Sequence, residues 1–485
     1  MAARLVRLLR RVLVLLLVVA ASLLAVRAYD SQRGAPLQLW HTFVPLELRA
    51  PEIDKADWTS WLKAEDAAFR EVRAEVVDKL DEENRSASNR YFAGSPIYPG
   101  GFVQDWNRSY VLEPDGPPVG AVVLLHGLTD APYSLRHIAR LYREHGFVAV
   151  GIRLPAHGTV PAALTDIEWE DWDAATRLAV REARRRAGPS VPLHIVGFSN
   201  GGALAVEYAL EALDDGRLAQ ADRLILISPM IGITAFARFA GLAALPAMFP
   251  AFAKAAWLGI LPEFNPFKYN SFPVNGARQS HRLTRSLQER LAAAARDGRL
   301  RRMPPILTFQ SVVDFTVSTR AVISSLYALL PANGSELVLF DLNRAAKISS
   351  GLLRSASETV LTRILPDPPR NYRTTLIANV TDDRQDVAER VTEAAATAER
   401  MRELDLAFPS GLFSLSHVAL PFPMYDTLYG LEPGEKESFG VNLGAIAPRG
   451  ERGVLIVDLD ALVRVSSNPF FPYIAERLEQ GMAKP

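Results

Sequence analysis

Short apolar runs alternate with amphipathic segments between residues 106 and 230, and this alternation constrains the fold more than any other feature of the sequence. The apolar runs have the length of strands and lie at 108–112, 121–125, 147–152, 193–196 and 224–227. Helical patterns at 134–144, 172–186 and 203–213 separate most of them. Continuous apolar strands joined by helices are typical of a buried, mostly parallel sheet. We therefore expect an α/β protein whose central sheet is flanked by helices, with a further strand at 306–310.

Composition narrows the classes of function. The 485 residues are 49% hydrophobic and 22% charged, which is enough apolar chain for a large core. The 54 basic and 54 acidic residues cancel, so we expect no nucleic-acid partner. Cysteine is absent, which excludes disulfides, thiolate metal sites and a cysteine nucleophile. The histidines show no metal-binding spacing and no phosphate-binding glycine motif is present, so we expect neither a metal nor a cofactor.

The first 28 residues have the pattern of a signal or anchor segment. Four arginines, at positions 4, 7, 10 and 11, precede an uncharged apolar run over 12–26. As a helix that run reaches about 22 Å, against about 30 Å for a bilayer core. The arginines favour a cytosolic N-terminus and export of the remainder to the extracytoplasmic, periplasmic side. We favour a retained membrane anchor because Arg27 makes the only candidate cleavage site poor; a cleaved leader and a soluble periplasmic or secreted protein is the alternative.

Changes in the pattern divide the rest of the chain. An N-terminal extension over 29–105 contains an amphipathic helix marked by Trp61, Val72 and Val76. Residues 230–262 are apolar with few charges and open a predicted helical lid over 230–300. The α/β core is predicted at 106–229, 301–341 and 410–430. An insertion at 342–409 includes a charged helix over 386–404, and a C-terminal extension follows at 431–485.

Residues 197–201, Gly-Phe-Ser-Asn-Gly, form a G-x-S-x-G motif. The strand predicted at 193–196 ends directly before the motif, and a helix rich in small residues begins directly after it. Strand, sharp turn and helix in this order hold a serine exposed in a strained conformation. Gly197 and Gly201 would permit the tight turn and the close helix–strand approach. We expect Ser199 to be a nucleophile; a plain turn between strand and helix is the alternative.

An acyl-transfer serine needs backbone donors for the oxyanion, one from the residue after it and one from the loop after an earlier strand. The strand at 121–125 is followed by His126, Gly127 and Leu128. We expect the N–H groups of Leu128 and Asn200 to supply these donors. His126 precedes the nucleophile in the chain, so we expect it to orient the loop together with Gly127 and not to act as the base.

The nucleophile also needs a base and an orienting carboxylate. Only His281 and His417 follow Ser199 in the sequence, and His417 is favoured because it follows the late apolar run 411–415. For the acid we favour Asp314, just past the strand at 306–310, over Asp341, which ends the strand predicted at 336–341. The chain order Ser199, Asp314, His417 is the one this strand–turn–helix arrangement leads us to expect.

These motifs resemble the α/β-hydrolase superfamily, and within it the bacterial carboxylesterases and monoacylglycerol-lipase-like serine hydrolases. The matching pieces lie at 126–129, 154–159, Trp169, Trp172, 197–201, 314–317 and His417. The resemblance covers about 106–230, 303–330 and a short stretch around His417, and it implies ester hydrolysis through an acyl-enzyme without a cofactor. Ala156 stands where relatives often have glycine, and the interval from Asp314 to His417 is longer than in a typical member.

The sequence therefore predicts a serine carboxylester hydrolase acting on a small acyl ester with a hydrophobic acyl or alcohol part. It is expected to be held at a membrane by its N-terminal helix, and no protein partner can be named. An amidase or thioesterase with the same three residues is one alternative. A catalytically inactive hydrolase fold that serves as an interaction module is another.

Overall fold

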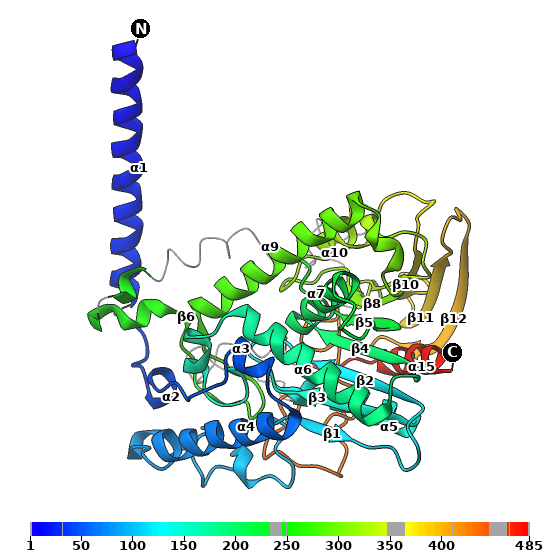
Figure 1. Cartoon of the computed structure of the whole chain (residues 1–485), viewed down its shortest axis with the longest axis horizontal. Helices are drawn as coiled ribbons and strands as arrows, with labels where there is room; N and C mark the ends of the chain where they lie inside the picture. The colour runs from blue at the N-terminus through cyan, green and yellow to red at the C-terminus, as the bar shows by residue number, and fades with distance from the viewer. Residues whose placement is uncertain are drawn as a thin grey trace.

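The computed structural model describes residues 2–31, 33–232, 245–248, 250–346, 364–409, 411–445, 463–464 and 466–483. A ten-stranded sheet forms its centre (Figure 1). Across the sheet the strands are β1 (Tyr110–Leu112), β3 (Phe147–Ile152), β2 (Gly120–Leu125), β4 (Leu193–Phe198), β5 (Arg223–Ile227), β8 (Ile306–Ser311), β9 (Glu336–Phe340), β10 (Arg373–Asn379), β11 (Asp386–Thr392) and β12 (Glu399–Ala407). The seven strands from β3 to β10 run parallel, while β1, β11 and β12 are antiparallel to their neighbours. The predicted mostly parallel α/β sheet is confirmed.

Two apolar clusters cover the two faces of this sheet. Val123 and Leu125 of β2 face one cluster, whereas Val122 and Leu124 face the other, as the two-residue period of a strand requires. The first cluster takes in helices α6 (Trp169–Ala187), α7 (Asn200–Asp214) and α9 (Val274–Arg296), and the second takes in α5 (Arg136–Glu144) and α15 (Phe471–Met482). Burial on both faces explains why the inner strands are mostly apolar and do not alternate between apolar and polar residues.

The charged helix predicted over 386–404 is wrong, because this segment forms β11 and β12. Its Ala, Glu and Arg content favours a helix, but β11 pairs along β10 and buries Val387, Ala388 and Val391. Pairing with an existing sheet edge overrides local propensity. The described part of 342–409 therefore extends the central sheet. The outer strand β12 is largely exposed and charged, which protects the edge of the sheet from further pairing.

The N-terminal extension contains the predicted amphipathic helix, here α4 (Trp58–Val72), which continues as the π-helical turn η1 (Arg73–Val77). Asp57 caps the helix by accepting a hydrogen bond from the Ser60 amide at 2.8 Å. The predicted apolar stripe is buried at Trp61, Val72 and Val76. This face of the helix therefore packs onto the body of the protein.

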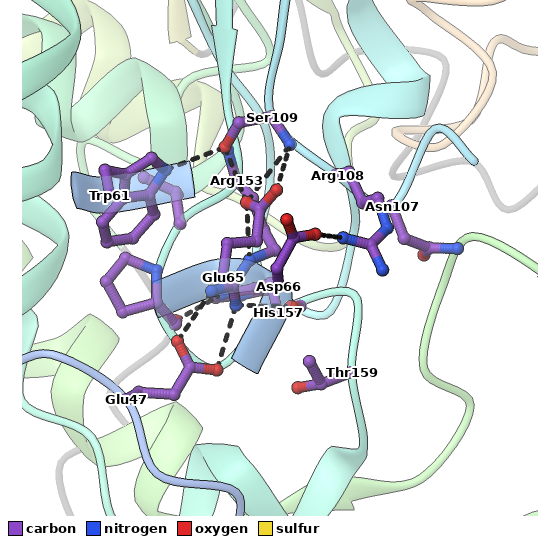
Figure 2. A network of polar contacts seen from close by, with 12 residues as sticks. Glu47, Trp61, Glu65, Asp66, Asn107, Arg108, Ser109, Arg153, His157 and Thr159 are labelled. Carbon is purple, nitrogen blue, oxygen red and sulfur yellow. Dashed lines mark hydrogen bonds and ion pairs between the residues drawn. The ribbon is translucent and has the colours of Figure 1, made fainter. Parts of the chain in front are cut away.

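A buried ion cluster attaches this extension to the core (Figure 2). The Arg153 guanidinium, after β3, is 2.9 Å from both oxygens of Glu47 and 3.0 Å from Glu65 of α4. Glu65 also accepts from the Ser109 hydroxyl at 2.8 Å, and that hydroxyl accepts from the Trp61 indole at 3.0 Å. Burial raises the pKa of Glu65 even though Arg153 opposes the shift. One guanidinium shared by two buried carboxylates therefore fixes the register of α4 on the core.

Helix α1 (Ala2–Ser31) stands away from the body of the protein (Figure 1). Its stretch Arg4–Val26 is 23 residues long with a mean hydropathy of 2.4, and none of it is buried. A helix of this length rises about 34 Å, enough for a bilayer core. Membrane anchors and signal sequences share this length and composition. At its base α1 contacts two short 3₁₀ helices, η7 (Leu245–Met248) and η8 (Pro250–Ala256).

The segment predicted as a helical lid is only partly described. After η8 it forms a small hairpin of β6 (Trp257–Gly259) and β7 (Phe272–Pro273) and then the long helix α9. Leu283, Leu287 and Leu291 of α9 belong to the main core, so this helix covers the sheet. Residues 233–244 and 249 lie outside the described residues.

Candidate active site

Ser199 occupies the sharp turn between β4 and α7. Its φ of 53° lies in the left-handed region, which costs about 1–3 kcal/mol for a residue with a side chain. The turn is held from both sides, because the Ser199 amide donates to the Ile227 carbonyl at 3.0 Å and the Ser199 carbonyl accepts from the Met230 amide at 2.9 Å. Ser199 is 7% exposed. The strand–turn–helix context that the motif predicts is therefore present.

Two glycines make this turn possible. A Cβ on Gly197 would lie 2.3 Å from the Gly201 carbonyl oxygen, and one on Gly201 would lie 2.0 Å from the Leu125 carbonyl oxygen. Neither approach tolerates a side chain. The second contact also brings the start of α7 against the end of β2, next to the loop that holds Leu128.

The loop after β2 lies directly beside Ser199. A Cβ on Gly127 would be 3.2 Å from the Ser199 Cβ. His126 fixes this loop, since its Nδ1 lies 2.9 Å from the Gly127 carbonyl oxygen and its Nε2 accepts from the Leu154 amide at 3.0 Å. Burial lowers the pKa of His126 well below its usual value, so the ring is neutral with its proton on Nδ1. Both nitrogens are engaged, which matches the orienting role expected of it.

The backbone N–H groups of Leu128 and Asn200 are the expected oxyanion donors. In the part of the chain that the structure describes, neither group donates to a protein oxygen. Asn200 is the first residue of α7, where the helix leaves its first amides unpaired and the helix dipole favours negative charge.

Asp314 and His417 meet across a long interval of chain. His417 Nδ1 lies 2.8 Å from Asp314 Oδ2, and both side chains are buried. Burial alone would raise the pKa of Asp314, but the His417 partner and hydrogen bonds from the Thr316 and Val317 amides, at 2.8 and 3.0 Å, outweigh it and lower that pKa. The carboxylate is thus held ionised and oriented toward the imidazole.

Two further side chains support this pair and were not predicted. Gln310 at the end of β8 donates to Asp314 Oδ2 at 3.1 Å. The Phe198 ring stacks on the His417 ring at a centroid distance of 5.2 Å, which places His417 beside the residue that precedes Ser199. Phe198 lies within the G-x-S-x-G motif and Gln310 lies on a predicted strand, but nothing in the sequence signals their contacts.

The alternative base and acid lie elsewhere. Asp341 follows β9, and its Oδ2 is 3.3 Å from the Arg344 guanidinium. His281 is part of α9. The segment from the start of β10 to the end of β12, residues 373–407, makes up most of the described chain between Asp341 and His417 and accounts for the long interval. Residues 411–415 form a loop without strand pairing, so within the described chain β12 is the last strand before His417.

The loop that carries His417 is anchored by a second buried cluster around Asp426. This carboxylate accepts from the Tyr133 hydroxyl at 3.0 Å and from Arg136 at 2.8 Å, and lies 2.9 Å from His137 Nε2. Burial opposes ionisation of Asp426, but Arg136 and His137 outweigh it and lower the pKa of this carboxyl. Burial also lowers the pKa of His137 to about 4. Because these three partners follow the Leu128 loop, the cluster connects the His417 loop to the predicted oxyanion side of the site.

Within the described residues no group of three or more histidine, aspartate or glutamate side chains is placed to hold a metal ion. The chemistry available at this site is that of a serine, an imidazole, a carboxylate and backbone amides.

Residues 116–328 match the Hydrolase_4 family model, described as serine aminopeptidase, S33. A thermostable monoacylglycerol lipase of Bacillus sp. (strain H-257) is 32% identical over 92 residues, which is 19% of this chain and 35% of that lipase. Among solved structures, one from a study of the metagenome-derived lipolytic enzymes LipS and LipT is 21% identical, with a TM-score of 0.39, over 50% of this chain and 89% of that one. A soluble variant of monoglyceride lipase from Saccharomyces cerevisiae is 12% identical, with a TM-score of 0.38, over 48% of this chain and 81% of that one.

The family match spans β2, β3, β4, β5 and β8, and therefore the strands that carry Ser199 and Asp314. It covers five of the seven parallel strands, and it includes the strand–turn–helix context of the serine. The resemblance of this chain to the α/β-hydrolase superfamily is confirmed over residues 116–328.

Proposed function

We propose that this protein is a serine hydrolase that cleaves carboxylic esters with a hydrophobic acyl or alcohol part. The observation that carries the proposal is the 2.8 Å contact between His417 Nδ1 and Asp314 Oδ2, beside a serine held at positive φ in a G-x-S-x-G turn. An imidazole whose Nδ1 proton points at a buried carboxylate has a free Nε2 lone pair, which is the atom that a serine nucleophile requires.

In this proposal Ser199 Oγ attacks the ester carbonyl while His417 Nε2 takes its proton. Asp314 holds the imidazole tautomer and stabilises the imidazolium that forms. The N–H groups of Leu128 and Asn200 bind the oxyanion of the tetrahedral intermediate. His417 then delivers the proton to the leaving alcohol. In the second half of the reaction His417 Nε2 takes a proton from water, which attacks the acyl-enzyme carbonyl, and returns that proton to Ser199 Oγ as the carboxylic acid leaves.

A lipophilic substrate is favoured by the apolar segment 230–262 and its position. Two of its described elements, η7 and η8, contact α1. If α1 lies in a bilayer, η7 and η8 lie at the membrane surface, where an acyl ester would be found. The matched lipase is named for monoacylglycerols, which belong to this chemical class. We propose that the segment acts as the lid over the acyl site.

An amide substrate is the second candidate, because the matching family model is described as a serine aminopeptidase. The same three residues serve either reaction. Hydrolysis of p-nitrophenyl esters with C2 to C12 acyl chains, measured beside aminoacyl p-nitroanilides, separates the two. We expect ester turnover that increases from C2 toward longer chains and little anilide turnover. A preference for the anilides in kcat/KM would refute the ester assignment.

We also propose that α1 anchors the protein in a membrane, with the hydrolase domain on the extracytoplasmic side. The four arginines at the start of α1 support this orientation. The anchored protein should stay with membranes after carbonate extraction and begin at or near Met1. A soluble protein that begins near Tyr29 would show instead that α1 is a cleaved leader.

A further inference from the structure

A cavity of about 510 Å³ lies between the N-terminal extension and the core, away from the proposed catalytic residues. Its walls come from α4, η1, the segment 90–108 and the loop after β3. Ser199, Asp314 and His417 are not among its lining residues. This volume is within the range of small-molecule sites. The extension therefore does more than cover the core, because it completes a second cavity.

Four arginines line this cavity, against a single acidic residue, Asp105. Two of the four are already paired. Arg108 is 2.5 Å from Asp66 (Figure 2) and 3.6 Å from Asp105, and Arg73 is 3.4 Å from Asp78. The remaining two, Arg70 and Arg90, have no carboxylate within ion-pair distance in the described part of the chain.

Arg90 is the unusual member, because its guanidinium is buried and incompletely bonded. The residue is 1% exposed. Its Nη2 donates to Asn107 Oδ1 at 3.1 Å and to the Gly158 carbonyl at 3.4 Å, while Nε and Nη1 have no hydrogen-bond partner among the described residues. A buried cation with unused donors carries a large desolvation cost, which an anion in the cavity would offset.

Glu263 lies near Arg90 but does not bond to its two unpaired guanidinium nitrogens. Glu263 attracts Arg90 electrostatically, but its two oxygens accept from the Asn270 and Ser271 amides, at 3.0 and 2.8 Å. Burial raises the pKa of Glu263. The tyrosine rings beside Arg90, Tyr91 and Tyr269, hold the guanidinium in place at 5.6 and 5.8 Å from their centroids.

The rest of the lining is apolar and aromatic, and includes Phe69, Val72, Val77, Tyr91, Tyr98 and Pro99. We propose that this cavity binds an amphipathic anion, with its carboxylate on Arg90 and Arg70 and its apolar body along these side chains. The proposal does not depend on ester hydrolysis, since it rests on the cavity and its unpaired guanidinium groups alone.

The test is calorimetric titration of the full chain, in non-ionic detergent, with octanoate, with octanol and with inorganic phosphate, against a detergent blank. We expect saturable octanoate binding and much weaker binding of octanol and phosphate. Arg70→Gln, at an exposed position, and Arg90→Lys should each weaken octanoate binding about ten- to hundred-fold, the effect of one lost charge-assisted hydrogen bond. The matched control Arg301→Gln, an exposed arginine outside the cavity, should leave it unchanged.

The alternatives are distinguishable. Octanol binding as tight as octanoate binding would show that the cavity does not recognise charge. Phosphate binding tighter than octanoate binding would contradict an amphipathic ligand. Octanoate binding that survives both substitutions would place the ligand elsewhere, and absence of saturable octanoate binding would overturn the proposal. Each measurement is made without turnover, so it is independent of whether the protein hydrolyses esters.

Discussion

Replacing Asp314 with asparagine tests the proposed acid in isolation. Oδ1 accepts from the Thr316 and Val317 amides, and an amide oxygen can keep both bonds. The other position, Oδ2, faces His417 Nδ1 at 2.8 Å and Gln310 at 3.1 Å. An amide nitrogen there would donate to Nδ1, which forces the His417 proton onto Nε2. The imidazole could then no longer accept the Ser199 proton.

The comparable substitution in a serine protease costs about 10⁴ in kcat, or about 5.4 kcal/mol of transition-state stabilisation. We expect a loss of that order here, with stability lowered by only about 1–3 kcal/mol, the range for one charge-assisted hydrogen bond. The assay is kcat for a p-nitrophenyl ester together with a thermal melt. Asp341→Asn is the matched control, since Asp341 also follows a sheet strand, and it should lose little activity. A variant Asp314→Asn with more than a tenth of wild-type kcat, or a larger loss in Asp341→Asn, would refute the assignment.

Three further outcomes are expected. Ala156 has a φ of 68°, so Ala156→Gly should relieve about 1–2 kcal/mol of strain, offset in part by chain entropy, and leave the unfolding free energy equal or slightly higher. In Gly158→Ala the new Cβ would meet a backbone oxygen at 2.6 Å, so this variant should have a clearly lower unfolding free energy in the same denaturant titration. Because the pKa of Asp426 is lowered, its ion pair stabilises the fold above about pH 4, and this contribution is lost as the pH falls further. Asp426→Asn should therefore make the free energy of unfolding fall less steeply on the acid side of its pH curve. An unchanged acid side would show that the cluster is not ionised as described. Phe252→Ala in η8 should reduce hydrolysis of C12 esters more than hydrolysis of C2 esters, because a lid residue would lose about 0.8 kcal/mol for each CH₂ of the acyl chain that is no longer buried. An equal loss on both esters would show that Phe252 has only a packing role.

Local sequence patterns predicted the inner strands of the sheet but not the strands at the edge formed by residues 386–404. The inner strands are mostly apolar because both faces of the sheet are covered, so they stand out in the sequence. The segment 386–404 has the composition of a helix and becomes strands only because β10 offers an edge to pair with. Its identity depends on a neighbour that composition does not reveal.

The residues of the candidate site also fall into some that the sequence could predict and some that it could not. Ser199 and its glycines could be predicted because strand, turn and helix are contiguous in the sequence. Outside the site, the Arg153 cluster that attaches the N-terminal extension could not be predicted, since its partners Glu47 and Glu65 lie 106 and 88 residues away. The one available signal was a glutamate on the apolar face of a predicted helix, four residues after Trp61. Asp426 and Gln310 gave no such signal, because only the folded chain brings them to their partners.

Covalent labelling with a fluorophosphonate, followed by intact-mass and peptide analysis, tests the proposed serine hydrolase most directly. The probe reacts only with a serine that a neighbouring base activates, and it needs no knowledge of the substrate. We predict one adduct per chain, on the peptide that contains Ser199, with no adduct in Ser199→Ala and strongly slowed labelling in His417→Ala. A folded wild-type protein that remains unlabelled, or an adduct on another serine, would contradict the account.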